Sequence, residues 1–257
     1  MTRLARPLLL ILVGCALLHV TVATELYLRY VKEGLRLPLI VSGAALAALG
    51  LLGLLHGGRE KGGQDNDHGD HEHSDHDHTA LPRTAWLMLL PALLLLLHPP
   101  APLGSYTAGR DSARTAASAS PRTPDTQLRF APMPAGDTVP MPLSEFTLRA
   151  QHDRKQSLKG RTVQLTGFVT PGRGGSWQLT RLVIACCAAD SQARKIEMHG
   201  VPAPPADTWV TVTGRWHPRG TLGTPAAANA LDVTALVEVP QPASPYTDTV
   251  PGTPGYG

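Results

Sequence analysis

Apolar residues in this chain gather before residue 104, where they form three long runs and not a spaced pattern. The runs cover 7–24, 37–55 and 85–104. A helix needs roughly 20 apolar residues to cross the hydrocarbon core of a bilayer. The first two runs reach that length, whereas the third reaches it only if the residues after His98 also lie at membrane depth. The pattern predicts a multi-pass plasma-membrane protein with two or three transmembrane helices.

After residue 143 the pattern changes, and apolar and polar positions alternate with the period of β-strands. A helix is predicted over 144–157, with Ser144 as its N-cap. Strands are predicted over 161–170, 177–187, 195–198, 208–216 and 231–239. Five short strands within roughly 80 residues indicate a small all-β domain, and an OB-like barrel is the expected form.

The predicted organisation has four parts. They are a transmembrane region over 1–104, a flexible linker over 105–143, a soluble β domain over 144–239 and a disordered tail over 240–257. If there are three spans, the Lys and Arg residues near their ends number five on each side of the membrane, so the positive-inside rule does not decide the orientation. Three spans with the N-terminus inside place the β domain outside the cytoplasm, which is the preferred prediction, whereas two spans place it in the cytoplasm.

Charge and cysteine content narrow the classes of function. The net charge of +3 gives no argument for nucleic-acid binding, and three cysteines cannot form a disulfide framework. Leu12–Cys15 also fits a lipoprotein cleavage site, but the residues after Cys15 stay apolar, which favours an uncleaved span. On the second span, glycines and alanines form a small-residue surface suited to close helix packing, within the chain or with a partner.

A tract rich in His and acidic residues lies between the second and third apolar runs, over 65–78. Its 14 residues hold five His, five Asp and one Glu. Imidazole and carboxylate groups together suit zinc and similar divalent ions. The alternative is a solvated low-complexity loop with incidental affinity for metal. The candidate ligands in this tract are His68, His71, His73, His76, His78, Asp67, Asp70, Asp75 and Asp77.

Two histidines in the apolar runs are further candidate ligands. His19 lies within the first run, where an ionisable group is costly and tends to face a partner. It is expected to coordinate an ion or to form a hydrogen bond with a neighbouring helix. His98 lies at the end of the third run, where a position at the membrane interface explains it equally well.

Adjacent cysteines, Cys186 and Cys187, close the predicted strand over 177–187. Neighbouring residues on a strand point to opposite faces, so the two thiols are not expected to share a metal ion. One alternative makes them small core residues. The other makes one of them a metal ligand or redox thiol, helped by Asp190, His199 or His217.

Several segments carry a resemblance to a known family. They are Leu18-His19 with Tyr27 and Tyr30, the His-rich tract, the segment 98–105, and, in the β domain, 160–169, Arg181–Cys187 with Ala189-Asp190, and 209–214. In these segments the chain resembles the YcgQ-type family of bacterial permease subunits. The resemblance implies partnership with a separate multi-span permease and a link to divalent metal, with zinc as the expected ion. It carries over no catalytic residues.

Three functions follow as hypotheses. The first is an accessory subunit of a membrane permease in zinc transport or homeostasis, with the permease and the lipid bilayer as partners. The second is a stand-alone membrane-anchored metal sensor or chaperone. The third is a membrane-tethered OB-type binder of oligosaccharide or peptide, with Trp177, Trp209 and Trp216 on its binding face. No P-loop, HExxH motif or Ser/His/Asp pattern occurs, so the chain is not expected to be an enzyme.

Overall fold

The computed structural model describes residues 2–57, 101–110 and 129–250. They form two compact units. The helical unit holds the residues up to Tyr27 and those from Gly34, and the β unit holds Leu28–Glu33 and the residues from Pro102. The His-rich tract and His98 lie outside the described residues, so the predictions made for them stay predictions.

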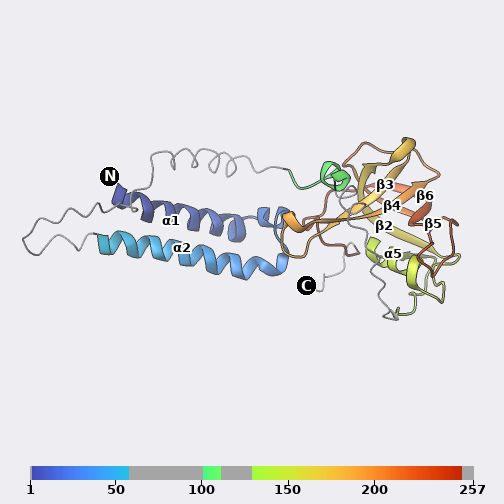
Figure 1. Ribbon diagram of the computed structural model, residues 1–257, viewed down its shortest axis with the longest axis horizontal. Coiled ribbons are helices and arrows are strands. Elements are labelled where there is room, and N and C mark those ends of the chain that lie inside the picture. The colour runs from blue at the N-terminus through green and yellow to red at the C-terminus, as the bar shows by residue number, and fades with distance from the viewer. Residues whose placement is uncertain (1, 58–100, 111–128, 251–257) are drawn as a thin grey trace, which may run out of the picture. The chain divides into compact units, whose positions relative to one another are not determined.

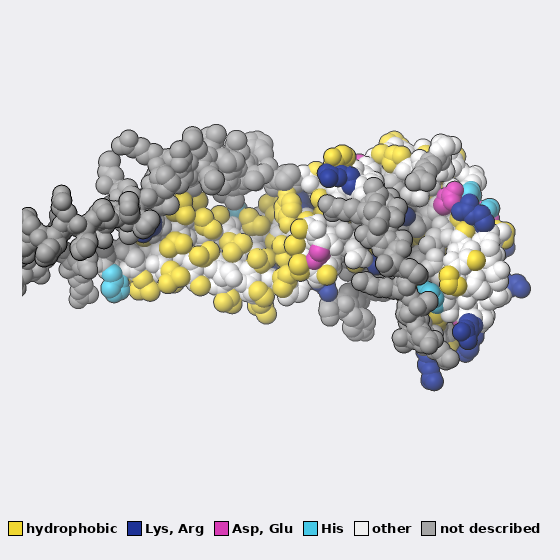
Figure 2. All heavy atoms as spheres, viewed as in Figure 1, with side chains coloured by type: hydrophobic (Ala, Val, Ile, Leu, Met, Phe, Trp, Pro, Cys, Tyr) yellow, Lys and Arg dark blue, Asp and Glu magenta, His cyan; other side chains and the backbone are white. Residues whose placement is uncertain are grey.

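The helical unit consists of two apolar helices, α1 (Thr2–Leu18) and α2 (Arg36–Gly57) (Figure 1). A π-helical turn, His19–Ala23, continues α1. Figure 2 shows hydrophobic side chains over the visible surface of both helices, and Leu37 and Val41 are 72% and 66% exposed. Helices that are apolar on the outside as well as at their contact are typical of membrane spans. Both are long and apolar enough to cross a membrane, which agrees with the first two predicted spans.

Small residues bring α1 and α2 into close contact. A Cβ atom added to Gly14 would lie 2.6 Å from the Gly43 carbonyl oxygen and 2.7 Å from the Ala47 nitrogen. One added to Gly50 would lie 2.6 Å from the Pro7 carbonyl oxygen. The small-residue surface predicted on the second span therefore packs, at least at Gly43 and Gly50, against the first helix of the same chain.

Six strands form one mixed sheet in the β unit. They are β1 (Thr138–Pro140), β2 (Thr162–Pro171), β3 (Trp177–Val183), β4 (Gln192–His199), β5 (Trp209–Trp216) and β6 (Ala230–Glu238). Five correspond to the predicted strands, with β3 shorter and β4 longer than expected. The additional strand, β1, lies in the predicted linker, where its three residues include a proline and gave no strand signal.

The sheet order is β1-β2-β3-β4-β6-β5, and β5 also pairs with β2. The pairings from β2 through β3, β4, β6 and β5 thus return to β2. Pairs β1–β2 and β4–β6 are parallel and the others antiparallel. The β5–β6 register shifts between Thr213 and Gly214, an irregularity typical of a glycine within a strand.

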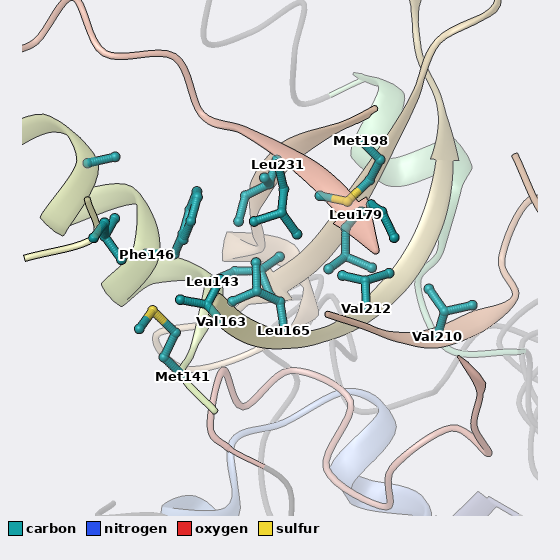
Figure 3. Close-up of a cluster of buried hydrophobic side chains, with 14 of the residues drawn as sticks. Met141, Leu143, Phe146, Val163, Leu165, Leu179, Met198, Val210, Val212 and Leu231 are labelled. Carbon is teal, nitrogen blue, oxygen red and sulfur yellow. The ribbon is translucent and has the colours of Figure 1, made fainter. Parts of the chain in front are cut away.

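A single large core lies under helix α5 (Leu143–His152) (Figure 3). Phe146 and Leu143 from the helix are fully buried and meet Leu165, Leu179 and other inward-facing residues of the strands. The helix ends at His152, five residues before the predicted end at 157. Ser144 is not its N-cap, because the helix begins at Leu143 after Pro142 and no side chain of the cap residue closes it.

Residues on both sides of the predicted β domain join its packing. Val139 and Met141, from the predicted linker, belong to the main core. From the predicted tail, Tyr246 is 5% exposed, and its hydroxyl oxygen accepts a hydrogen bond from the Leu103 N–H at 2.7 Å. The expected disorder of the tail is therefore wrong for the part described, up to residue 250. Leu103 also belongs to the β unit, which corrects the predicted end of the third span at 104.

Candidate functional site

The candidate site lies on the turn that follows β3. The strand ends at Val183, and the chain then bends through Ala185 and Cys186 into a short 3₁₀ turn, Ala188–Asp190. Cys186 and Cys187 are therefore not on a regular strand. The prediction that their thiols face opposite sides is wrong, because the alternation of a strand does not apply within a bend.

The turn gathers three side chains that could hold a metal ion. One ligand atom each from Cys186, Cys187 and Asp190 lies within 4.8 Å of the other two. This is the one group of three or more His, Cys, Asp or Glu side chains so placed in the described ranges 2–57, 101–110 and 129–250. We call these three residues the dithiol site. Zinc holds thiolate sulfur at about 2.3 Å and carboxylate oxygen at about 2.0–2.2 Å, so small side-chain rotations would bring all three onto one ion.

The Asp190 carboxylate builds the turn as well as lining the site. Its Oδ1 accepts the Ala185 N–H at 2.9 Å, and its Oδ2 accepts the Cys186 and Cys187 N–H groups at 2.8 and 3.4 Å. The Cys186 thiol also donates a hydrogen bond to it, and this bond is the largest cause that lowers the pKa of Asp190. Backbone amides thus fix the carboxylate in place beside the two sulfurs.

The same hydrogen bond raises the pKa of the Cys186 thiol to about 11, with a smaller contribution from its hydrogen bond to Cys187. At neutral pH the thiol is therefore protonated and a poor nucleophile, since the thiolate is the reactive form. A bound cation would take the place of that proton, because metal binding to thiols releases protons. The raised pKa of Cys186 therefore argues against nucleophilic catalysis by this thiol.

The segment before α2 reaches the dithiol site through its backbone. Lys32 donates its N–H to the Cys186 carbonyl oxygen at 3.1 Å, and Ala188 donates its N–H to the Tyr30 carbonyl oxygen at 2.7 Å. Val31 forms an isolated antiparallel bridge with Cys187. We call Leu28–Glu33, which belongs to the β unit, the inter-helix segment. Sequence reasoning missed this neighbour, since its residues carry no ligand pattern and lie far from Cys186 in the sequence.

The other predicted ligands do not join this site. His19 is exposed at the start of the π-helical turn and is outside the dithiol group. His199 lies at the opposite end of β4, since Val183 pairs with Gln192 at the end near the turn. Its ring stacks on that of His217 at 4.2 Å, and His217 Nδ1 lies 2.7 Å from Asp232 Oδ1. Of the three predicted helpers of the thiols, the structure brings only Asp190 to them.

Comparison with known proteins gives a family match for part of the chain. No curated protein and no solved structure matches the chain. Residues 147–247 match the family model of the DUF1980 C-terminal domain. The matched residues extend from within α5 to beyond β6 and include the dithiol site. In this region the chain is similar to the DUF1980 C-terminal domain, consistent with a member of the DUF1980, YcgQ-like family.

Proposed function

We propose that this protein is a membrane-anchored metal-binding protein whose β unit takes one thiophilic divalent ion, with zinc as the first choice, at the dithiol site. The observation that carries the proposal is the convergence of two sulfurs and one carboxylate oxygen within 4.8 Å. Three protein ligands leave a fourth position open, as in zinc sites that exchange a ligand. Such a site suits a protein that senses an ion or hands it on.

The anchoring part of the proposal rests on the two apolar helices. The core helix of a soluble protein can be equally apolar, but it is buried. Here only 17% of residues 6–23, and 11% of an 18-residue window within 33–56, are buried within the molecule. We infer that lipid, or the helices of a partner, covers their outer faces.

We infer the topology from the inter-helix segment. Its backbone hydrogen bonds to Cys186 and Ala188 support a topology in which this segment and the β unit lie on the same side of the membrane. In this topology His56, at the far end of α2, lies on the opposite side, and the chain would have to cross back before Pro102. The third apolar run, over 85–101, would supply that crossing at the short end of the usual length, about 17 residues.

Cysteine labelling tests this topology. In a background with Cys15, Cys186 and Cys187 replaced by serine, single cysteines are introduced at Glu33, Asp137 and His56. We expect a membrane-impermeant maleimide, added to oriented vesicles, to label positions 33 and 137 from one side and position 56 from the other. Labelling of positions 33 and 137 from opposite sides would contradict the proposed topology.

The ring of strand pairings supports a finer proposal, that the β unit is an OB-like barrel. The closed order β2-β3-β4-β6-β5 with one parallel pair fits a small Greek-key barrel. Binding of oligosaccharide or peptide on a tryptophan face is disfavoured, however. Trp177 and Trp209 are 2% and 9% exposed and pack in hydrophobic clusters, so they offer no surface for stacking.

Metal titration tests the proposed function. The full-length protein in mild detergent, with the five histidines of the tract replaced by serine, is titrated with Cd²⁺ as a spectroscopic substitute for Zn²⁺. We expect one ion per chain and thiolate-to-metal charge-transfer absorption. Replacing Cys186 and Cys187 by serine should weaken binding by more than about 100-fold, since even groups that only orient ligands contribute about 10–100-fold. Binding should also weaken as pH falls, because protons compete for the thiols.

The matched control is Cys15→Ser, which makes the same substitution at an exposed position of α1 and should leave binding unchanged. Equal Cd²⁺ affinity with and without Cys186 and Cys187 would contradict the proposal.

Mass spectrometry of the same preparation addresses the permease implied by the family resemblance. A stoichiometric multi-span permease in the eluate would make the protein an accessory subunit, whereas a zinc-loaded chain eluting alone would make it a stand-alone sensor or chaperone.

A further inference from the structure

Two of the three residues of the dithiol site also hold the inter-helix segment. Cys186 offers its carbonyl oxygen to the Lys32 N–H, and Cys187 forms the bridge with Val31. The Ala188 N–H completes the contact at the Tyr30 carbonyl oxygen. Side chains that would bind an ion and backbone groups that bind the segment therefore belong to the same five-residue stretch, Cys186–Asp190.

The side chain of Asp190 holds this stretch in shape. The Asp190 carboxylate accepts N–H groups from Ala185, Cys186 and Cys187, and all of these bonds lie at an exposed or partly exposed turn. Exposed turns with few buried contacts open easily, so this geometry is expected to fluctuate. An ion bound to Cys186, Cys187 and Asp190 would cross-link the two ends of the turn and restrict the peptide groups between them.

We propose that metal binding at the dithiol site fixes the inter-helix segment Leu28–Glu33 on the β unit, so that metal occupancy controls the docking of this segment. The proposal rests on the metal-binding function proposed above and adds its regulatory output. Because α1 ends before this segment and α2 begins after it, a metal-controlled contact here conveys occupancy to the helical unit through a short covalent connection.

Thermodynamic linkage gives the proposal a second consequence. If the ion strengthens docking by some factor, docking strengthens ion binding by the same factor. A variant that weakens docking without touching a ligand should therefore weaken metal affinity. Lys32→Pro is such a variant, because proline lacks the N–H that bonds to the Cys186 carbonyl oxygen. Val31 before it is already extended, the conformation favoured before proline.

The experiment measures hydrogen exchange of the full-length protein in detergent, with the tract histidines replaced by serine, with and without Zn²⁺. We expect Zn²⁺ to slow exchange of the Lys32 and Ala188 amides by about fivefold or more, the low end of ordinary coupling between sites. Lys32→Pro should weaken Zn²⁺ binding by a similar factor. Lys32→Ala, which keeps the N–H and removes an exposed side chain, is the matched control and should bind Zn²⁺ as the parent does.

The outcomes separate this inference from the function on which it rests. If Zn²⁺ binds stoichiometrically and exchange over residues 28–33 does not change, the docking proposal is wrong and the metal-binding proposal stands. If Zn²⁺ does not bind at Cys186 and Cys187, both are wrong. Weaker Zn²⁺ binding by Lys32→Ala, equal to that of Lys32→Pro, would also overturn the docking proposal, because the side chain and not the hydrogen bond would then be responsible.

Discussion

Replacing Asp248 with alanine is expected to lower the free energy of unfolding of the β unit by about 3–5 kcal/mol, the usual cost of removing one partner of a buried ion pair. The Arg181 side chain is 3% exposed, and its Nε lies 3.9 Å from Asp248 Oδ1. Burial lowers the pKa of Arg181 and the Asp248 charge opposes that shift. Without Asp248 the buried guanidinium would keep, among the residues described, its contact with the Trp209 ring and a long hydrogen bond to the Thr249 carbonyl oxygen.

Asp248 has a second role that adds to this loss. Its Oδ1 and Oδ2 accept the Leu143 and Ser144 N–H groups at 3.0 and 2.7 Å, so it caps the N-terminus of α5 from a distant part of the chain. Loss of an N-terminal cap costs about 0.5–2 kcal/mol by itself. The same carboxylate therefore joins β3, α5 and the C-terminal segment.

Urea unfolding of the full-length protein in detergent, followed by tryptophan fluorescence, measures this effect. Asp137→Ala is the control, because Asp137 is exposed and its replacement should change stability by no more than about 0.5 kcal/mol. The double variant Arg181→Met with Asp248→Ala should recover part of the loss, since it also removes the unpaired charge. A midpoint for Asp248→Ala within error of that of Asp137→Ala would show that the pair contributes nothing.

The strands could be predicted because each carries its own signal. Alternating β-branched residues in 162–171 and 209–216 identify half-buried strands without reference to the rest of the chain. β1 could not be predicted in this way, since three residues that end in proline are too short to show a period. Its place is set by pairing with β2, which is a tertiary contact.

The predictions for the tail and for the start of α5 failed for the same reason: both features depend on contacts between residues far apart in the sequence. A segment rich in proline and threonine normally lacks the apolar content to fold, and composition therefore predicted disorder after residue 239. Two residues order this segment. Tyr246 is buried in a second, smaller hydrophobic cluster of the β unit, and Asp248 caps α5. The N-cap was assigned to Ser144 on local sequence, whereas the capping carboxylate comes from more than 100 residues away.

For the candidate site, the sequence predicted the residue types and not their geometry. Apolar residues continue from β3 into Ile184, which favoured a strand as far as Cys187. The strand in fact ends earlier, because the Asp190 side chain accepts the N–H groups of residues 185–187 that would otherwise continue a ladder. A carboxylate three residues after a Cys-Cys pair is the signal that could have indicated a turn.

Replacing Gly14 with leucine is expected to separate α1 from α2. The Cβ of the new side chain would lie 2.6 Å from the Gly43 carbonyl oxygen and 2.7 Å from the Ala47 nitrogen, and neither is a side-chain atom that can rotate away. Overpacking of a close contact costs about 1–3 kcal/mol and occasionally more. The substitution disrupts the close packing of small residues, a contact that holds apolar helices together in a membrane.

A disulfide cross-link measures the separation. The Cβ of Pro7 lies 3.3 Å from the position of a Cβ added at Gly53, within reach of the Cβ separation of about 3.5–4.5 Å in disulfides. With the three native cysteines replaced by serine, Pro7→Cys with Gly53→Cys should therefore cross-link readily. Adding Gly14→Leu should slow this at least severalfold, whereas leucine at the adjacent exposed position 15 should not. Equal cross-linking in both variants would mean that contact between Gly14 and Gly43 does not set the spacing of the helices. A selective loss would mean that it does, and that the glycines of α2 pack within this chain and not against a partner.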